Sequence, residues 1–325
     1  MNPNREQNQA HSGLTIQPKQ TSNSKMVNNG KSIKSRPITN RKGRKDFSGD
    51  SKNTTTTDEK YQHLLNLLHD MGKIAVAYSG GVDSTFLLAA AKQASVAKLI
   101  ALTMKRPYFA QWELEEATNL VKKLGIPHKI IELPVDDKMS FNPPDRCYLC
   151  KSSTFKRFRE EMDQLGFDTL LDGTNADDIQ EYRPGLRAVK EFKVRSPLQE
   201  TGFTKAEIRQ KSRELGLPEW DKPSNTCLVT RIPYHTDISN NDLRMIEKAE
   251  LFLMKEGFRL VRVRKYDDHA RIEVDPGMVD ELLKKDKMNH ISSYLGTLGF
   301  KNVSVDLEGY KTGNLDKTIL KNTNN

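Results

Sequence analysis

Residues 73–91, KIAVAYSGGVDSTFLLAAA, join an apolar strand, a glycine turn and the start of a helix. Gly80 and Gly81 let the backbone approach an anion closely, and the N–H groups of the first helical turn would point at that anion. Ser79 and Ser84 add hydroxyl donors, and Asp83 is a candidate magnesium ligand among phosphate oxygens. No Gly-Lys-Ser/Thr follows, so the loop differs from that of the γ-phosphate-transferring nucleotide triphosphatases. The stretch predicts a phosphate-binding loop between a strand and a helix.

Strand and helix patterns alternate through the first two thirds of the chain. Strands are expected at residues 73–78, 98–103, 128–133 and 169–171, and helices at 111–124, 152–165 and from Thr204 to Leu215. This alternation favours an α/β fold with a doubly wound parallel sheet. In such sheets ligands bind beyond the carboxyl ends of the strands. The segment 172–178, DGTNADD, follows a strand there, so Asp172, Gly173 and Asn175 are candidate nucleotide-binding residues, although helix capping also suits Asn175.

The last part of the chain has a different pattern. A helix at 241–256 precedes alternating strands at 259–264 and 269–274, a helix at 278–287 and a strand at 301–307. We expect a small antiparallel α+β domain. Alternation places Arg262 and Arg264 on one face of a strand, with Glu273 on its neighbour. These residues could form a solvent-exposed face with a cross-strand ion pair, or they could bind an anionic substrate.

Composition divides the chain unevenly. Of the net charge of +9, residues 1–57 supply 11 Lys and Arg against 3 Asp and Glu, which leaves 41 against 40 for the rest. The first segment has too few apolar residues to fold, and the nearly neutral remainder argues against nucleic-acid binding. No run of 18 apolar residues predicts a membrane span. The expected organisation is a disordered basic tail at 1–57, a nucleotide-binding domain at 58–218, a connector at 219–238, the small domain at 239–312 and a frayed end at 313–325.

Three cysteines are the remaining candidates for chemistry. Cys147 and Cys150 have a metal-chelating spacing, and Cys227 lies in the connector. A structural zinc needs a fourth ligand, for which His235 is the best candidate. Three thiolates alone suit a 4Fe-4S cluster with one open iron, and three separate buried thiols are the simpler alternative. An odd number of cysteines argues for a reducing compartment, so we expect a cytoplasmic protein.

These motifs together resemble the LarE family, the ATP-dependent sulfur transferases of nickel-pincer nucleotide cofactor biosynthesis. The phosphate loop by itself resembles that of the N-type (PP-loop) ATP pyrophosphatases. The resemblance covers residues 61 to 310 and is carried by 79–84 (SGGVDS), 142–151 (NPPDRCYLCK), 172–178 (DGTNADD), 182–186 (YRPGL), 195–198 (RSPL), 220–223 (WDKP) and 231–234 (RIPY). The family typically has Ser-Ala-Cys where this chain has Asn225-Thr226-Cys227.

The resemblance implies a specific activity. ATP would adenylate the carboxylates of pyridinium-3,5-biscarboxylic acid mononucleotide, and sulfur would then displace AMP. ATP would be bound by two segments, with Mg²⁺ on Asp83. Their residues are Ser79, Gly80, Gly81, Asp83, Ser84, Asp172, Gly173 and Asn175. Cys147, Cys150 and Cys227 would carry a 4Fe-4S cluster that binds sulfide from a donor the sequence does not identify.

Further implications concern the substrate and the assembly. Arg262, Arg264 and Glu273 would bind the anionic substrate, and the family's hexamers imply that this chain is a homo-oligomer. Two other functions share some of these features. A tRNA thiolation enzyme would need zinc motifs or a basic face, and a non-catalytic nucleotide-binding protein would not need an intact loop.

Overall fold

The computed structural model describes residues 56–179 and 185–313. The predicted disordered tail lies outside this range except for Thr56 and Thr57, which instead begin a helix. Also outside the described range are Tyr182, Arg183 and Pro184 of one sequence motif, and the predicted frayed end after Gly313. Helix α1 (Thr57–Asp70) is capped by Thr56, whose hydroxyl accepts from the Glu59 N–H while the Glu59 carboxylate accepts from the Thr56 N–H.

The larger sheet has four parallel strands in the order β3-β2-β1-β4. These are β1 (Lys73–Ala77), β2 (Lys98–Lys105), β3 (His128–Glu132) and β4 (Thr169–Leu171). The chain builds outward from β1 to β3 and then returns to the other side of β1. This change of direction places the carboxyl end of β1 at the switch point of the sheet, where doubly wound folds bind ligands.

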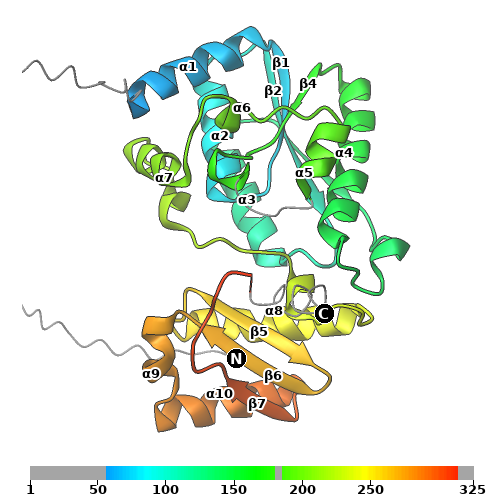
Figure 1. Cartoon of the computed structure of the whole chain (residues 1–325), viewed down its shortest axis with the longest axis vertical. Helices are drawn as coiled ribbons and strands as arrows, with labels where there is room; N and C mark the ends of the chain where they lie inside the picture. The colour runs from blue at the N-terminus through cyan, green and yellow to red at the C-terminus, as the bar shows by residue number, and fades with distance from the viewer. Residues whose placement is uncertain (1–55, 180–184, 314–325) are drawn as a thin grey trace, which may run out of the picture. The chain divides into compact units, whose positions relative to one another are not determined.

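Helices cover both faces of this sheet (Figure 1). Ile74 and Val76 of β1 pack with α1, α2, α3 and α7, whereas Ala75 faces α4 and α5. Burial on both faces explains why the strands are apolar runs rather than alternating ones. The bounds are α2 (Val82–Gln93), α3 (Gln111–Leu124), α4 (Arg146–Leu165), α5 (Gly185–Glu191), α6 (Pro197–Glu200) and α7 (Lys205–Glu214). The doubly wound α/β prediction is confirmed.

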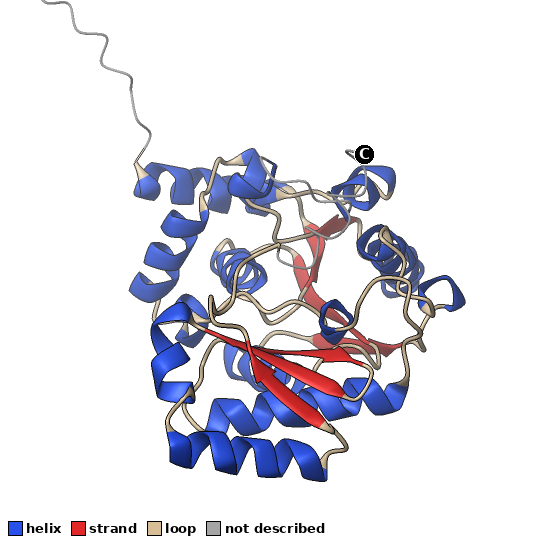
Figure 2. Cartoon of the chain, turned by 60° about the horizontal axis from the view of Figure 1, so that its bottom comes forward, coloured by secondary structure: helices blue, strands red, loops and turns tan. Residues whose placement is uncertain are grey.

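The smaller sheet has the order β5-β6-β7, formed by β5 (Val261–Tyr266), β6 (His269–Val274) and β7 (Asn302–Val305). Strands β5 and β6 are antiparallel, but β7 pairs parallel with β6, so the expectation of an antiparallel domain was wrong. A parallel neighbour requires a crossover, which α9 (Val279–Leu282) and α10 (Lys285–Thr297) provide. Helices α8 (Asn240–Lys255) and α10 pack on the apolar face of this sheet (Figure 2).

Short helical turns link these elements. They are η1 (Asp137–Met139), η2 (Asp177–Ile179), η3 (Pro218–Asp221), η4 (Leu228–Arg231) and η5 (Pro276–Met278). The predicted connector contains most of η3 and all of η4, and Cys227 is the N-cap residue of η4. Tyr108, Met139, Leu228 and Ile246 belong to one buried apolar cluster, against which Cys150 and Cys227 pack.

Candidate active site

The phosphate loop turns sharply between β1 and α2. Gly80 has a φ of +75°, and a Cβ atom on it would lie 2.7 Å from the Cβ of Ala117 on α3. Only glycine tolerates both the backbone conformation and the close neighbour. The sequence signal at this position therefore has a specific physical cause.

Helix α2 begins with backbone donors that no side chain caps. Gly81 is its N-cap residue and makes no side-chain capping bond. Ser84 holds the loop in shape, since its hydroxyl lies 3.1 Å from the Ser79 hydroxyl and donates to the Gly81 carbonyl at 3.2 Å. Uncapped N–H groups at a helix start, beside two hydroxyls, form an anion-binding cradle of the kind the sequence predicts.

Asp83 faces this loop from the first turn of α2. Its Oδ2 accepts a 2.6 Å hydrogen bond from the Lys205 ammonium, whereas its Oδ1 is buried and has no hydrogen-bond partner. A carboxylate oxygen without a partner is suited to a magnesium ion, because hard cations prefer oxygen ligands. Lys205 begins α7, and Lys222 of the connector donates to the Gly80 carbonyl at 3.5 Å. The sequence assigned neither lysine to the site: Lys222 appears only within the motif at 220–223, and an isolated lysine at a helix start, such as Lys205, carries no distinctive spacing.

The segment after β4 lies directly against the phosphate loop. A Cβ on Gly173 would lie 2.9 Å from the backbone nitrogen of Ser84, so this glycine permits the contact. Asp172 is buried and accepts hydrogen bonds from the hydroxyls of Thr174 and Ser196, both at 2.7 Å. Asn175 accepts from the N–H groups of two following residues, as a helix cap does. Asp172 and Asn175 therefore shape the loop through their own bonds.

Cys147 and Cys150 lie in the first turn of α4, which begins at Arg146 rather than near Ser152 as the sequence predicted. At positions i and i+3 they occupy one side of the helix. Tyr108 is fully buried and donates its hydroxyl to the Cys150 Sγ at 3.4 Å. The Tyr108 carbonyl accepts from the N–H of Leu228, which brings Cys227 to the same place. The fold thus gathers cysteines that are far apart in sequence.

The electrostatics of these thiols reflect that grouping. Burial, with a smaller contribution from the neighbouring Cys147 and Cys150, raises the pKa of the Cys227 thiol to about 12. Burial also raises the pKa of Tyr108, with Cys150 adding to the effect. None of the three cysteines is in a disulfide. Within the described residues no three His, Cys, Asp or Glu side chains are arranged to hold a metal ion. His235, the candidate fourth zinc ligand, is therefore in no such group.

The donor set nevertheless suits an anionic group held by thiolates. Cys147, Cys150 and Arg146 lie close enough to Cys227 to act electrostatically on its thiol, and the buried Nε and Nη1 of Arg146 have no hydrogen-bond partners. A 4Fe-4S cluster takes cysteine thiolates as its ligands, and the ligated cluster is an anion. The residue types match those that such a cluster takes, but within the described residues three of them are not brought into a metal-binding arrangement.

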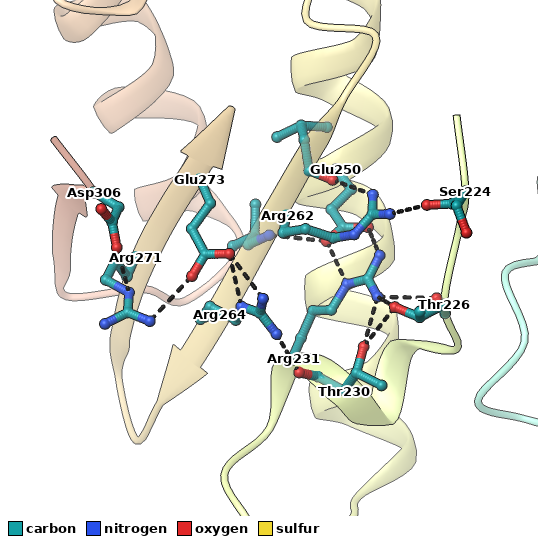
Figure 3. A network of polar contacts seen from close by, with 12 residues as sticks. Ser224, Thr226, Thr230, Arg231, Glu250, Arg262, Arg264, Arg271, Glu273 and Asp306 are labelled. Atoms are coloured by element: carbon teal, nitrogen blue, oxygen red, sulfur yellow. Dashed lines mark hydrogen bonds and ion pairs between the residues drawn. The ribbon is translucent and has the colours of Figure 1, made fainter. Parts of the chain in front are cut away.

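Arg262, Arg264 and Glu273 are buried, with exposed fractions of 3%, 5% and 0%. The solvated-face alternative is therefore wrong for them. Arg264 donates from Nε and Nη2 to the Glu273 carboxylate at 3.0 and 2.8 Å (Figure 3). The other Glu273 oxygen accepts from Arg271 at 3.0 Å. The strand pairing explains the arrangement, because Arg262 lies opposite Glu273 on the face away from the apolar cluster.

The same arginines hold the connector on both sides of Cys227. Arg262 donates to the Ser224 carbonyl at 2.6 Å, and Arg264 donates to the Thr230 carbonyl at 2.6 Å (Figure 3). Arginines from one strand thus fix the carbonyls three residues before and three residues after the cysteine.

A second buried ion pair supports this arrangement. Arg231 donates to both carboxylate oxygens of Glu250, at 2.8 and 3.0 Å. The Glu250 carboxylate raises the pKa of Arg231 against the opposing effect of burial. Burial and the positive charge of Arg231 lower the pKa of Arg262, whose Nε has no hydrogen-bond partner. These three side chains line a pocket with Glu113, and burial raises the pKa of the Glu113 carboxyl.

Comparison with known proteins bears on this site. Residues 73–142 match the family model of the queuosine biosynthesis protein QueC, a PP-loop family. A protein of Lactiplantibacillus plantarum named pyridinium-3,5-bisthiocarboxylic acid mononucleotide synthase is 33% identical over 270 residues, which cover 82% of this chain and 97% of that protein. The chain belongs to the LarE family. Uncharacterized proteins of Synechocystis sp. and Methanocaldococcus jannaschii are 35% and 36% identical, over 99% and 91% of their lengths.

Membership of the LarE family agrees with the described architecture. The PP-loop match begins at β1 and continues past the phosphate loop into the segment before α4. None of the described helices is long and apolar enough to cross a membrane. The family and the intact loop indicate an enzyme that uses ATP.

Proposed function

We propose that this chain is an ATP-dependent sulfur transferase that converts the carboxylates of pyridinium-3,5-biscarboxylic acid mononucleotide into thiocarboxylates for the nickel-pincer nucleotide cofactor. The observation that carries the proposal is similarity to the Lactiplantibacillus plantarum synthase across 97% of that protein's length. The phosphate loop supports it independently, because its uncapped helix start and Asp83 suit a nucleotide with magnesium.

The reaction has two steps. A substrate carboxylate oxygen attacks the α-phosphorus of ATP, an O–P bond forms, and the bond to the bridging oxygen breaks to release pyrophosphate. The uncapped loop N–H groups, and Lys205 beside Asp83, would stabilise that developing negative charge. A sulfur nucleophile then attacks the activated carbonyl carbon, a C–S bond forms, and the C–O bond to AMP breaks. Asp83 would hold Mg²⁺ on the phosphates through its Oδ1.

We assign substrate binding to the pocket beside Cys227. Arg262 is the better candidate there, because its Nε has no partner and its side chain lines the pocket. Arg264 and Glu273 bind each other and would support the site by positioning the connector. The ATP site would be shaped by the remaining residues of the phosphate loop and of the segment after β4, namely Ser79, Gly80, Gly81, Ser84, Asp172, Gly173 and Asn175.

The sulfur would come through Cys147, Cys150 and Cys227. As ligands of a 4Fe-4S cluster they would leave one iron open, and such a cluster when bound supplies a place to hold sulfide. Arg146 beside them would offset the negative charge of that group. Thiols kept reduced favour the cytoplasm. We propose a homo-oligomer on the family resemblance.

The test is anaerobic turnover with ATP, Mg²⁺, sulfide and the dicarboxylate mononucleotide. The proposal requires that pyrophosphate release depend on the mononucleotide and that mass spectrometry detect a thiocarboxylate. Pyrophosphate release that depends on tRNA instead would indicate a tRNA-thiolating enzyme. ATP binding without pyrophosphate release from either substrate would indicate a non-catalytic nucleotide-binding protein.

A further inference from the structure

The pocket beside the connector is lined by charged side chains of both signs, and two of them have no ion-pair partner. The charged lining residues are Glu113, Arg231, Glu250, Arg259 and Arg262. Arg231 pairs with Glu250 at 2.8 Å, and Arg259 pairs with Asp221 at 3.0 Å. Among the residues that the structure describes, Glu113 and Arg262 pair with no opposite charge. The pocket therefore contains one acid and one base that a ligand could satisfy.

Arg262 supplies the positive charge. Its guanidinium donates to the carbonyls of Ser224 and Val261 at 2.6 and 2.7 Å, and its buried Nε has no hydrogen-bond partner (Figure 3). Burial and the nearby charge of Arg231 lower the pKa of Arg262. Backbone carbonyls accept its hydrogen bonds but carry no net charge, so an anionic group of a ligand would compensate this buried cation.

Glu113 supplies the negative charge. It lies in the first turn of α3, where an acid favours the helix dipole, but α3 has no side-chain capping bond. Burial raises the pKa of Glu113, whereas a side-chain hydrogen bond with Asn225 and the charge of Lys222 oppose that effect. Asn225 replaces the serine that the LarE family typically has before the last cysteine, so this contact is a feature of this chain.

One acid and one base without ion-pair partners suit a ligand that carries both charges. A ligand with negative charge alone would satisfy Arg262 but would be repelled by Glu113, and a neutral ligand would satisfy neither. Trp112 also lines the pocket and provides an aromatic surface, on which a flat cation can stack. These features together indicate a planar cationic ring that bears acidic groups.

We propose that Glu113 is a specificity-determining residue that binds the positively charged ring of a zwitterionic ligand, while Arg262 binds an anionic group of the same ligand. In the proposed reaction the ring is the pyridinium of the mononucleotide. The enzyme then distinguishes a ring whose nitrogen is substituted, and therefore charged, from a neutral aromatic dicarboxylate. Naming this ring rests on the proposed function, whereas the charge complementarity rests on the pocket itself.

The test compares two ligands of the same shape that differ in the charge of the ring, 1-methylpyridinium-3,5-dicarboxylate and 5-methylbenzene-1,3-dicarboxylate. Ligand-observed NMR titration measures both dissociation constants for the full-length protein at pH 8, without ATP or sulfide. The variants are Glu113→Gln, Glu113→Asp and Glu116→Gln. Glu116 gives the matched control, because it lies one turn further along α3 and is exposed, with Lys222 as its ion-pair partner.

We expect the wild type to bind the pyridinium ligand about tenfold more tightly than the benzene ligand, because only the former pairs with Glu113. Glu113→Gln should reduce this preference to about threefold or less, mainly by weakening binding of the pyridinium ligand. Glu113→Asp should keep most of the preference, and Glu116→Gln should keep all of it. A role of Glu113 in the helix dipole alone would lower Tm without changing the ratio of the two dissociation constants.

A wild type that binds neither ligand, or that binds both equally, would overturn the proposal. An unchanged ratio in Glu113→Gln, or an equal loss in Glu116→Gln, would overturn it as well. No step of the titration depends on adenylation or sulfur transfer. Failure of the charge recognition therefore leaves the proposed function standing, and failure of turnover leaves the measured preference standing.

Discussion

Replacing Glu273 by Gln tests whether the arginine network holds the small sheet to the connector. The substitution keeps the shape of the side chain and removes its charge. Glu273 is fully buried and accepts two hydrogen bonds from Arg264 and one from Arg271. Removing one partner of a buried ion pair leaves an uncompensated charge and costs about 3–5 kcal/mol. A solvated pair would cost about 1 kcal/mol or less.

The assay is urea unfolding followed by circular dichroism, with the free energy of unfolding extrapolated to water. Asp268→Asn is the matched control, because Asp268 pairs with Lys301 beside the same sheet but both side chains are exposed. The control should unfold as the wild type does. Because Arg264 also holds the Thr230 carbonyl, Glu273→Gln should additionally speed alkylation of Cys227. A stability loss below about 1 kcal/mol would refute the reasoning.

Three further predictions concern the phosphate loop and the thiols. Asp83→Asn should slow pyrophosphate release about a hundredfold, a typical effect of losing a group that stabilises developing charge, with no change in Tm; an unchanged rate in a pyrophosphate-coupled assay would remove Asp83 from the mechanism. Gly173→Ala should destabilise the protein by about 1–3 kcal/mol in urea unfolding and raise the KM for ATP. The reason is that the Cβ of the alanine would lie 2.9 Å from the Ser84 nitrogen. A fully active and stable variant would contradict that contact. The pKa of Cys227 is raised from 9.0 to about 12, so between these pH values the native state holds a proton that the unfolded chain loses. The free energy of unfolding should therefore fall as pH rises from about 9 towards 12. A Cys227→Ser variant with the same pH profile would contradict this.

The sequence predicted the parts of the fold that local chemistry determines. The strand, glycine turn and helix around Ser79 follow from apolar runs and from glycine, and the structure has them there. The capping pair of Thr56 and Glu59 at the start of α1 is likewise local, because its two residues are only three positions apart. The doubly wound sheet followed from the alternation of elements, which restricts topology strongly.

Features that depend on packing were harder to predict. Helix α4 begins six residues earlier than Ser152, because a segment after two prolines with polar and cysteine residues has no apolar period to reveal it. The parallel pairing of β7 depends on the crossover through α10, which local alternation does not encode. Periodicity placed Arg262 and Arg264 on one face, but only the folded connector shows that this face is buried.

The candidate site shows the same division. Motif spacing identified the cysteines and Asp83 as candidates, and the fold brings Cys147 and Cys150 near enough to Cys227 to act on its thiol. Arg146 and Lys222 appear in the sequence only as members of the motifs at 142–151 and 220–223, and Lys205 gives no signal beyond its charge. Their importance comes from burial or from contacts across more than 100 residues of sequence, such as Lys205 with Asp83.

The most direct test of the account is one anaerobic turnover experiment on protein reconstituted with iron and sulfide. The protein receives ATP, Mg²⁺, excess sulfide and pyridinium-3,5-biscarboxylic acid mononucleotide, and mass spectrometry measures both the product and the intact chain. Cluster-based transfer predicts several thiocarboxylates formed per chain, with Cys147, Cys150 and Cys227 all unchanged in mass. Conversion of Cys227 to dehydroalanine, with about one sulfur delivered per chain, would show that the cysteine is consumed and would contradict cluster-based transfer. Absence of any thiocarboxylate would contradict the proposed function itself.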